Sequence, residues 1–349
     1  MKEITPKASV LVTGASGYIA SWIVKYLLEG GYTVHATVRN KSKTVKIDHL
    51  LKMQANYPNQ LKFFEADLLK KGTFEAAMQG CELVIHTASP FKTKVKDAQK
   101  ELIQPALDGT INVLDTVNKT SSVKRVVLTS SVVAIYGDAV DMENTAKGTF
   151  TEEHWNSTSN ANHQPYPYSK TVAERKAWEM TDNQKNWDLV VINPGFVLGP
   201  SLSNRKDSTS TDFMCSMLGG DFKTGTPALV FGVVDVRDVA KAHVLAGTIP
   251  TAKGRHILSA SSYSMLELAD FLRKNYGDRK LPKKELPKFL IYMAGPLTAG
   301  LSWKYINKNV GYPLLFDNSY SIKDLGIQYR EIETTLNDQA AQLIKDKLV

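Results

Sequence analysis

A phenol and an ammonium group stand four residues apart near the middle of the chain, in Tyr166-Pro167-Tyr168-Ser169-Lys170. On a helix, residues at this spacing project from the same face. Pro167 fits the first turn of such a helix, where its missing N–H is no loss. A lysine cation favours the charged form of a nearby phenol, so we expect the pKa of Tyr166 to move down from about 10 towards a useful acid/base range. The pair is a candidate proton donor for a carbonyl oxygen.

Hydroxyl side chains close a short apolar segment upstream of this pair, in Thr129-Ser130-Ser131. If that segment is a strand of a parallel sheet, the hydroxyl groups lie at the carboxyl edge of the sheet, where ligands bind. A hydroxyl group there can hold the oxygen atom of a substrate. The spacing alone leaves Ser130 and Ser131 as alternatives.

A glycine-rich turn lies near the N-terminus, in Thr13-Gly14-Ala15-Ser16-Gly17-Tyr18-Ile19-Ala20. It follows an apolar segment that we predict as a strand and opens a predicted helix, which is the context in which this motif binds a dinucleotide. Gly14 permits the tight turn, and Gly17 lets the backbone approach a pyrophosphate at the exposed N–H groups of the helix start. The small Ala20 allows the helix to pack closely on the sheet. The turn therefore predicts a dinucleotide site.

The charges after the second predicted strand distinguish between the two nicotinamide coenzymes. A site for NAD places Asp or Glu there to bind the ribose 2′-hydroxyl. Positions 30–47 contain no acidic residue; Arg39 closes the strand, and Lys41, Lys43 and Lys46 follow it. A planar arginine fork can hold two oxygens of a 2′-phosphate. We therefore expect NADP(H), the alternative being that these are solvated surface charges.

Two further segments end predicted strands at the same edge of the sheet. Asp67-Leu68 follows the third strand, where a side chain and a backbone group can face the adenine. His86-Thr87-Ala88-Ser89-Pro90 ends the fourth strand, beside the crevice at the carboxyl ends of the strands. We interpret His86 as a core histidine and assign it no acid/base role.

The elements that must position these residues alternate between short β-rich apolar runs and longer helical patterns. The predicted strands are 9–13, 33–38, 61–65, 83–87, 124–130 and 188–193. The predicted helices between them are 18–29, 45–55, 73–78, 97–118 and 168–181. This pattern predicts an α/β fold of the Rossmann type, a doubly wound parallel sheet.

The pattern loosens after Pro194. We predict loops over 201–212 and 219–227 and helices over 234–245, 264–274 and 331–347. Residues 1–195 are then the dinucleotide-binding domain, with 229–250 returning to it. Residues 196–228 and 251–349 form a smaller C-terminal substrate-binding lobe. Within the stretch 281–313, an apolar helix-like segment over 289–301 could wall the pocket, bind a partner or simply pack.

The composition excludes several classes of protein. The chain has 349 residues and a formal charge of +8, but its basic residues are scattered rather than gathered into one stripe, so we expect no nucleic-acid partner. Its apolar runs fall short of the roughly 20 residues of a membrane span. We expect no membrane partner, no secretory signal and a cytoplasmic location. Cys81 and Cys215 provide neither a disulfide framework nor a metal site, and nothing distinguishes a monomer from a homodimer.

Taken together, these motifs resemble the extended short-chain dehydrogenases/reductases of the dihydroflavonol 4-reductase group. That group also contains cinnamoyl-CoA reductases and methylglyoxal, aldehyde and ketone reductases. The resemblance covers most of the first 250 residues. The residues that carry it are Val10-Leu11-Val12-Thr13-Gly14-Ala15-Ser16-Gly17-Tyr18-Ile19, Ala36-Thr37-Val38-Arg39, His86-Thr87-Ala88-Ser89-Pro90, Arg125-Val126-Val127-Leu128-Thr129-Ser130-Ser131, Tyr166-Pro167-Tyr168-Ser169-Lys170, Asn193-Pro194-Gly195, Gly199-Pro200 and Asp235-Val236-Arg237-Asp238-Val239-Ala240-Lys241-Ala242-His243.

The resemblance implies a role for each part of the site. Ser131 would be the catalytic serine, Tyr166 the proton donor, and Lys170 the residue that tunes Tyr166 and holds the nicotinamide ribose. Arg39 and Lys46 would bind the 2′-phosphate. The residues expected at the coenzyme are Gly14, Ser16, Gly17, Tyr18, Ile19, Arg39, Lys46, Asp67, Leu68, Thr87, Ala88, Ser89, Thr129, Tyr166, Lys170, Pro194, Gly195 and Val197. The residues expected at the substrate are Phe91, Ser131, Tyr136, Tyr166 and Phe196.

The sequence also departs from the group at two places that bear on the substrate. Tyr136 stands five residues after Ser131, where plant dihydroflavonol reductases have an Asn that grips flavonoid hydroxyls. The cinnamoyl-CoA reductase signature Asn-Trp-Tyr-Cys-Tyr is replaced by Gln164-Pro165-Tyr166-Pro167-Tyr168. These departures argue against a flavonoid and against that thioester.

We therefore expect NADPH-dependent reduction of an aldehyde or ketone, in which Tyr166 protonates the oxygen and Ser131 orients it. A sugar-nucleotide epimerase or dehydratase is one alternative, although such enzymes generally keep NAD tightly bound and Arg39 favours NADP(H). A redox-sensing regulator is another, although such proteins usually lose the pair that Tyr166 and Lys170 form. Reduction of an activated C=C bond would use the same coenzyme.

Overall fold

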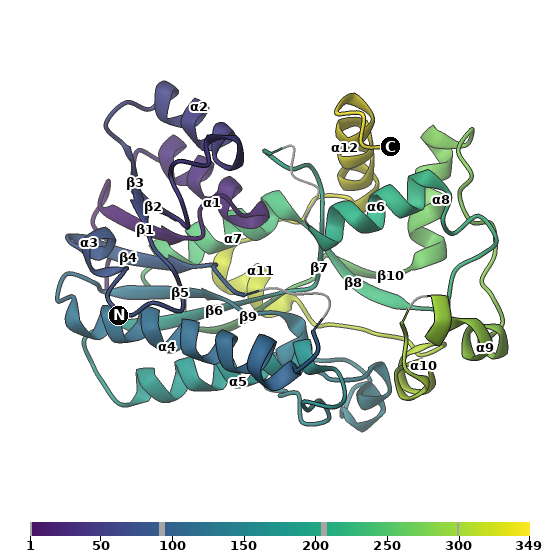
Figure 1. Cartoon of the computed structure of the whole chain (residues 1–349). Coiled ribbons are helices and arrows are strands. Elements are labelled where there is room, and N and C mark those ends of the chain that lie inside the picture. The colour runs from purple at the N-terminus through teal and green to yellow at the C-terminus, as the bar shows by residue number, and fades with distance from the viewer. Residues whose placement is uncertain (1, 91–94, 204–207, 299) are drawn as a thin grey trace.

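The computed structural model of the chain describes residues 2–90, 95–203, 208–298 and 300–349 (Figure 1). A seven-stranded sheet forms its centre, in the order β3-β2-β1-β4-β5-β6-β9. Every neighbouring pair in this sheet is parallel. Its strands are β1 (Ser9–Thr13), β2 (Thr33–Val38), β3 (Leu61–Glu65), β4 (Cys81–His86), β5 (Arg125–Thr129), β6 (Asp188–Pro194) and β9 (Gly254–Leu258).

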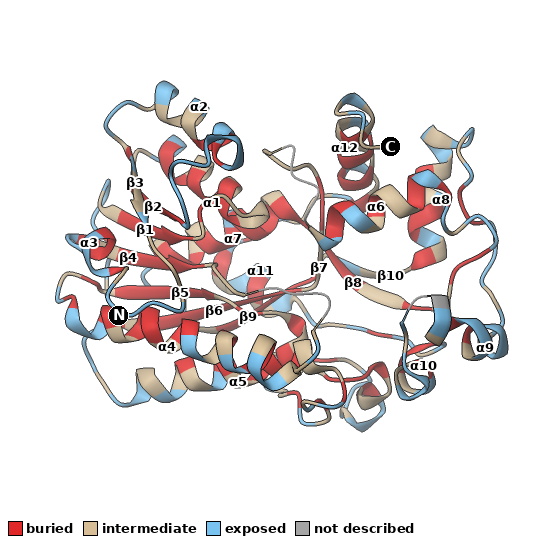
Figure 2. Ribbon diagram, in the orientation of Figure 1, coloured by how far each residue is buried: buried red, intermediate tan, exposed pale blue. Residues whose placement is uncertain are grey.

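Helices cover both faces of this sheet. Along β1, Val10 and Val12 share a buried cluster with α1 and α7, whereas Leu11 packs with α4 and α5. This alternation follows from the two-residue period of a strand, and it explains why β1 is apolar on both of its faces. Figure 2 shows the buried residues continuing through the sheet into the helices on either side. The helices of this part are α1 (Tyr18–Glu29), α2 (Asp48–Asn56), α3 (Glu75–Met78), α4 (Gln104–Lys119), α5 (Pro165–Asp182), α7 (Val236–Thr248) and α11 (Ser319–Leu325).

A second, three-stranded sheet in the order β10-β8-β7 begins the C-terminal lobe. Its strands are β7 (Phe196–Leu198), β8 (Val230–Asp235) and β10 (Ser261–Ser264). Gly195 alone separates β6 from β7, so the two sheets meet at one residue. A Cβ at Gly195 would lie 2.1 Å from the carbonyl oxygen of Gly232, and the Gly195 amide donates to Leu258 O at 2.9 Å. Only glycine allows this close approach.

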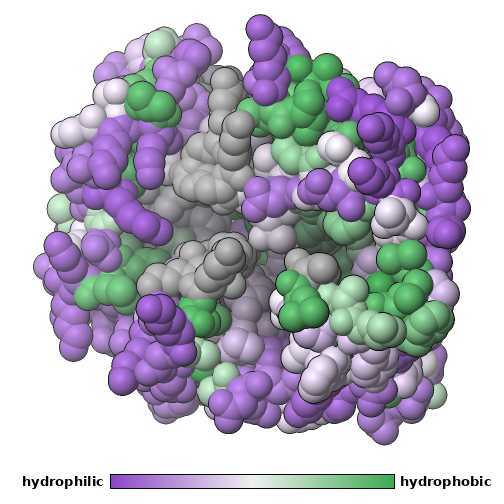
Figure 3. Space-filling view, turned by 45° about the vertical axis from the view of Figure 1, so that its right-hand side comes forward, coloured by the Kyte–Doolittle hydropathy of each residue, from purple (hydrophilic) through white to green (hydrophobic). Residues whose placement is uncertain are grey.

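The lobe has its own buried cluster, in which Leu198 and Val233 of the small sheet pack with Met214, Leu268 and Leu336 of its helices. Figure 3 shows a hollow on the face between the two parts of the molecule. The lobe helices are α6 (Thr209–Gly219), α8 (Met265–Tyr276), α9 (Lys288–Thr298), α10 (Trp303–Asn309) and α12 (Ile332–Lys345). Short turns of helix occur at η1 (Thr44–Lys46), η2 (Gln99–Ile103), η3 (Val132–Ala134) and η4 (Ala139–Asn144). In the described part of the chain, no helix is both long enough and apolar enough to cross a bilayer.

The predicted α/β fold and its six strands are confirmed, with ends that differ by at most two residues. The seventh strand, β9, belongs to the central sheet, whereas the prediction places residues 251–349 in the C-terminal lobe. It carries Arg255 and His256. Both side chains are buried with acidic partners: Arg255 pairs with Glu174 and His256 with Asp324. A charged residue in a strand is tolerated in the interior when it is paired.

Two other boundaries differ from the prediction. The segment predicted as a helix over 234–245 begins as strand β8, and α7 starts only after Asp235, whose carboxylate caps the helix by accepting from the Arg237 amide at 2.7 Å. Of the segment 229–250, only α7 therefore lies on the central sheet, since β8 belongs to the small one. The loop predicted over 201–212 contains the start of α6, because Ser208 accepts from the Thr211 amide and caps that helix.

Candidate functional site

Helix α5 carries both members of the candidate proton-donor pair. It starts at Pro165 rather than at the predicted position 168, directly after Gln164, whose φ of 56° turns the chain into the helix. Proline suits the first positions because the N–H groups there have no partner within the helix. Tyr166 and Lys170 lie one turn apart, with the Lys170 Nζ 5.9 Å from the centre of the Tyr166 ring.

Burial shifts the pKa of the two groups in opposite directions. It raises the pKa of Tyr166 to about 12, so the expected downward shift is wrong: the cost of burying a phenolate outweighs the effect of the nearby cation. Burial lowers the pKa of Lys170 to about 8, and the Glu174 carboxylate acts in the opposite direction. At neutral pH, Tyr166 keeps its proton and Lys170 is an ammonium.

The structure separates the roles of the two adjacent serines after β5. The buried Ser130 hydroxyl donates to Glu174 Oε2 at 2.5 Å. Ser131 is half-buried at the start of η3, and its Oγ lies 3.4 Å from both Pro194 O and the Val133 amide nitrogen. These contacts are at the long end of the hydrogen-bond range. The Ser131 hydroxyl is therefore the one that can turn to a substrate oxygen, and η3 packs against α5.

Glu174 lies one turn after Lys170 on α5 and is 1 % exposed. Its Oε2 also accepts from Asn193 Nδ2 at 2.9 Å, and its Oε1 accepts from Arg255 Nε at 2.6 Å. Asn193 Nδ2 also donates to Ser131 O at 3.1 Å. One buried carboxylate thus connects the helix of the proton donor to strands β6 and β9 and to the serine backbone.

A small pocket opens where β4 and β5 end against α4 and α5. Lys170 lines it together with His86 and Ser89. His86 is 2 % exposed, its Nδ1 lies 2.8 Å from Thr13 Oγ1, and burial lowers its pKa to about 3. The imidazole is therefore neutral at physiological pH, which supports its interpretation as a core histidine. The remaining lining residues are Ala88, Ala106, Thr110, Leu128, Thr129, Ser130, Ala173 and Glu174.

The glycine turn has the geometry of an anion site. Gly14 has a φ of +63°, and a Cβ there would lie 3.0 Å from the Ala88 Cβ. The Gly14 amide donates to Thr37 Oγ1 at 3.2 Å, and the Gly17 amide donates to Gly14 O at 2.8 Å. Gly17 is the N-cap of α1 and has no side chain to cap it, so the amides of the first turn are left for an anion. The turn fits a pyrophosphate.

The cations expected at the 2′-phosphate stand at the end of β2. Arg39 follows the strand directly and Lys46 ends η1, and both side chains are exposed. The loop between them is held by Glu65 of β3, whose Oε1 accepts from the Lys41 amide at 2.7 Å. Exposed guanidinium and ammonium groups at this end of the sheet fit the 2′-phosphate of NADP(H).

Other predicted coenzyme residues lie around the same edge of the sheet. The amides of Thr87 and Ala88 both donate to Thr13 Oγ1 at 3.1 Å, which fixes the chain after β4. The Ser89 side chain lines the pocket beside Lys170. In the first turn of α1 and its approach, Ser16 and Ile19 are half-buried. Pro194, Gly195 and Val197 lie at the passage from β6 to β7.

Two residues that are predicted to contact the coenzyme direct their side chains to partners within the chain. The Tyr18 hydroxyl donates to Gly199 O at 2.5 Å, which directs the phenol towards the C-terminal lobe. The Thr129 Oγ1 lies 2.7 Å from His243 Nε2, on the face of the sheet that α7 covers. Hydrogen-bonding contact of these two residues with a coenzyme is therefore expected through their backbone.

The two residues expected at the adenine also have partners within the chain. Asp67 Oδ1 accepts from the Leu69 amide at 3.0 Å, and Leu68 O accepts from Asn112 Nδ2 at 2.9 Å. The Leu68 carbonyl has a second lone pair, so the predicted backbone contact with the adenine stays possible beside the bond to Asn112. The second carboxylate oxygen of Asp67 takes no part in this turn.

The residues expected at the substrate are spread over several elements. Phe91 lies outside the described residues. Phe196 on β7 packs against Phe213 and Phe231 of the lobe, with ring centres 5.1 and 5.2 Å away. The Tyr136 ring lies 5.3 Å from that of Phe150 in a separate aromatic cluster. The structure does not bring Tyr136 and Phe196 into one contact group.

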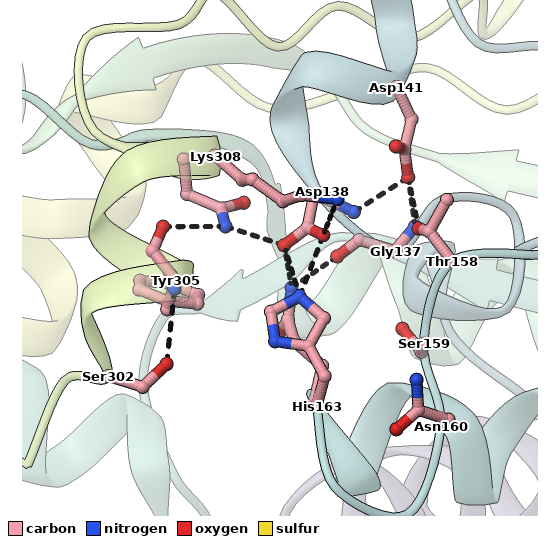
Figure 4. A network of polar contacts seen from close by, with 12 residues as sticks. Gly137, Asp138, Asp141, Thr158, Ser159, Asn160, His163, Ser302, Tyr305 and Lys308 are labelled. Carbon is pink, nitrogen blue, oxygen red and sulfur yellow. Dashed lines mark hydrogen bonds and ion pairs between the residues drawn. The ribbon is translucent and has the colours of Figure 1, made fainter.

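A buried polar network ties the start of α5 to the C-terminal lobe (Figure 4). The Asp138 carboxylate is fully buried and lies 2.8 Å from His163 Nε2. It accepts from Gln164 Nε2 at 2.8 Å and from Asn309 Nδ2 at 2.8 Å, and Lys308 Nζ lies 3.5 Å away. Helix α10 is thereby anchored to the segment that leads directly into Tyr166.

The sequence pattern assigned no role to Glu174, Asn193, Arg255 or Asp138. Glu174 stands in Ala-Glu-Arg-Lys, which reads as a solvated helix face. A usable signal was available for Glu174 alone, since it lies one helical turn after Lys170 and therefore on the same face. The partners of Asp138 are far apart in the sequence and carry no local signal.

Comparison with known proteins gives the family. The family model described as "NAD dependent epimerase/dehydratase family" matches residues 10–258. The curated relative "Cinnamoyl-CoA reductase CAD2" of Medicago truncatula is 38% identical over 344 residues, covering 97% of this chain and 96% of its own. "Tetraketide alpha-pyrone reductase 1" of Arabidopsis thaliana is 34% identical over 342 residues, covering 97% and 96%.

A solved structure shows that this chain shares its fold with a known reductase. The structure of yeast methylglyoxal/isovaleraldehyde reductase Gre2 complexed with NADPH is similar to this chain with a TM-score of 0.80 and 30% identity, covering 97% of this chain and 99% of its own. The likeness extends through the C-terminal lobe, beyond the region that the family model matches. The chain belongs to the NAD-dependent epimerase/dehydratase family of extended short-chain dehydrogenases/reductases.

Proposed function

We propose that this protein reduces the carbonyl group of an aldehyde or ketone to an alcohol with NADPH. The observation that carries this proposal is the pairing of Tyr166, which keeps its proton at neutral pH, with the ammonium of Lys170 on one face of α5. The Ser131 hydroxyl lies on η3, which packs against the same helix. A proton donor, a cation and a hydroxyl group are the parts that carbonyl reduction needs.

The residues of this chain perform the proton part of the reaction. NADPH, when bound, supplies the hydride. The Ser131 hydroxyl donates a hydrogen bond to the carbonyl oxygen and holds it near Tyr166, which supplies proximity. The Tyr166 hydroxyl gives its proton to that oxygen as negative charge develops on it. The Lys170 ammonium stabilises the tyrosinate that remains.

The coenzyme assignment rests on the glycine turn and on Arg39 and Lys46. The turn offers uncapped helix amides for the pyrophosphate, and the two exposed cations suit a 2′-phosphate. Two similar structures, the yeast reductase and Gre2 from Candida albicans, are described as complexes with NADPH, which supports the same coenzyme here. A nucleotide-binding domain and a substrate-binding lobe are then the two parts of the molecule.

The substrate class is proposed from the departures in the sequence and from the relatives. The similar yeast enzyme is named for methylglyoxal and isovaleraldehyde, and curated relatives are named for cinnamoyl-CoA and anthocyanidin. Tyr136 packs in an aromatic cluster with Phe150 and Phe316, where a flavonoid reductase of this group has an Asn. We therefore place aldehydes and ketones ahead of flavonoids and acyl-CoA esters.

The test is steady-state consumption of NADPH with aldehydes, diketones, dihydroflavonols and acyl-CoA esters, with NADH as the coenzyme control. Turnover of an aldehyde or diketone with NADPH is expected, and its product is the alcohol. NAD that stays bound through gel filtration would favour an epimerase or dehydratase. Tight NADPH binding without turnover would favour a regulator, and a product reduced at C=C would replace the carbonyl assignment.

A further inference from the structure

Five large apolar side chains are exposed together at the far end of the lobe. Four lie on α9: Phe289 is 61% exposed, Leu290 39%, Met293 73% and Leu297 89%. Trp303, at the first position of α10, is 66% exposed. We call these five residues the α9 surface. Figure 3 shows apolar side chains gathered on this side of the molecule, beside hydrophilic ones.

The positions on α9 form one stripe. Residues 289, 293 and 297 recur every four residues, and residue 290 lies beside them, so at 3.6 residues per turn they share one side of the helix. The opposite side is anchored, because Ile291 is 7% exposed in the lobe core and α9 packs on α10. The helix is therefore held in place with its apolar stripe outward.

The grouping of its exposed apolar side chains distinguishes the α9 surface from the rest of the described chain. The other large apolar side chains that are exposed there stand on separate elements: Val45, Leu69, Leu315 and Ile322. Single exposed apolar residues are ordinary, whereas a contiguous patch marks an interaction site.

Basic residues dominate the chain around this surface. Between positions 279 and 308 there are seven basic residues and one acidic residue, Glu285, so this short stretch carries most of the net charge of +8, and the expected scatter of the basic residues does not hold here. Lys280, Lys283, Lys284 and Lys304 are exposed. The basic residues are Arg279, Lys280, Lys283, Lys284, Lys288, Lys304 and Lys308.

We propose that the α9 surface binds the headgroup region of an anionic lipid membrane, with α9 lying in the plane of the interface. An outward stripe of Phe, Leu and Met on α9, followed by Trp303 and flanked in the chain by exposed lysines, suits an interfacial helix, whose apolar residues enter the acyl boundary while lysines meet anionic headgroups. At 1.5 Å per residue, the 11 residues of α9 extend about 16 Å, which is too short to cross a core of about 30 Å. Adsorption of α9 to a membrane surface departs from the expectation of no membrane partner, which rested on the lack of an apolar run long enough to span a bilayer.

The charges favour a lipid over a second copy of the chain. In a twofold dimer the same patch meets itself, so the basic surroundings of one copy would face those of the other. A surface of anionic lipids instead offers opposite charge to the exposed Lys280, Lys283, Lys284 and Lys304. The proposal does not depend on the proposed function, because its test requires neither coenzyme nor substrate.

The test is sedimentation of the full-length protein with vesicles. Protein is expected to pellet with vesicles of phosphatidylcholine and phosphatidylglycerol, and to stay in solution with phosphatidylcholine alone. Added salt should release it, since screening weakens attraction to charged headgroups. Met293→Ser/Leu297→Ser should remove binding to the mixed vesicles, and Lys283→Gln/Lys284→Gln should weaken it at least tenfold.

Matched variants elsewhere on the surface serve as controls. Val45→Ser removes an exposed apolar residue, and Lys70→Gln/Lys71→Gln removes an adjacent pair of exposed lysines, so both should bind as the parent does. Because all of these side chains are exposed, circular dichroism should show the same folded state for every variant. Absence of the parent from both vesicle pellets overturns the proposal. So does a parent dimer in analytical ultracentrifugation that Met293→Ser/Leu297→Ser converts to a monomer while vesicle binding is unchanged.

Discussion

Glu174 lies one helical turn beyond Lys170 on α5, and its buried carboxylate opposes the effect of burial on the pKa of the Lys170 ammonium. Burial alone makes the neutral amine easier to form, while the carboxylate favours the cation. The same carboxylate binds Ser130, Asn193 and Arg255. The charge of Lys170 and the position of the serine segment therefore depend on one buried carboxylate.

We first expect carbonyl reduction to fall as the pH rises through about 8, because the Lys170 ammonium loses its proton there. Glu174→Gln removes the charge that favours the ammonium, so the alkaline limb of the kcat/KM profile should move to lower pH. Arg255→Gln is the matched control. It breaks the ion pair between Arg255 and Glu174 but removes a positive charge, so it should not move the alkaline limb to lower pH. Equal downward shifts in both variants would show that the network acts only through stability.

The second prediction concerns Tyr166. Tyr166→Phe should lower kcat by about 10²- to 10⁴-fold, because it removes the proton donor and leaves the ring in place. Binding of NADPH, followed by fluorescence titration, should change little. Tyr168→Phe removes a phenol two residues away on the same helix and should retain activity. Normal turnover of a model aldehyde by Tyr166→Phe would refute the mechanism.

Coenzyme choice gives the third prediction. Arg39→Ala should raise the KM for NADPH by roughly tenfold to a hundredfold, since a charge-assisted hydrogen bond contributes about 1.5–3 kcal/mol. The KM for NADH, which has no 2′-phosphate, should stay the same. Lys52→Ala, which removes a 75% exposed cation from the neighbouring α2, is the control for a general loss of positive charge. A parallel rise for both coenzymes would contradict the assignment of Arg39 to the phosphate.

The fourth prediction tests the network in Figure 4. Asp138→Ala removes a fully buried acceptor that His163, Gln164 and Asn309 share. We expect the free energy of unfolding to fall by about 3 kcal/mol or more. Asp182→Ala removes an exposed carboxylate at the last position of the same helix α5 and should be neutral. Denaturant unfolding measures both, and equal effects would remove Asp138 from the anchor of α10.

The parallel strands and the glycine turn could be predicted from sequence because each depends on local chemistry. Short runs rich in apolar residues and bounded by turn residues indicate strands, and β1, β2 and β3 begin and end where the pattern does. The glycine motif acts through the backbone of adjacent residues. The pair Tyr166 and Lys170 needs only one helix to bring it together.

The parts that could not be predicted depend on residues far apart in the chain. Strand β9 looks polar until Arg255 is seen beside Glu174, 81 positions earlier. The pKa of Tyr166 was expected to fall because the lysine is visible in the sequence, whereas the burial that raises it is not. Thr129 likewise reads as a free hydroxyl until His243 is brought against it by α7.

The single glycine between β6 and β7 has a consequence for how this fold can be altered. The chain enters the lobe at Gly195, returns to the central sheet with α7, leaves it after β9, and comes back with α11 before ending on α12. The lobe is therefore built from several separate stretches of the chain, so deleting any one stretch would not remove the whole lobe. We expect that new substrate preferences on this scaffold are acquired loop by loop or helix by helix, because a lobe without contiguous ends cannot be exchanged as a cassette.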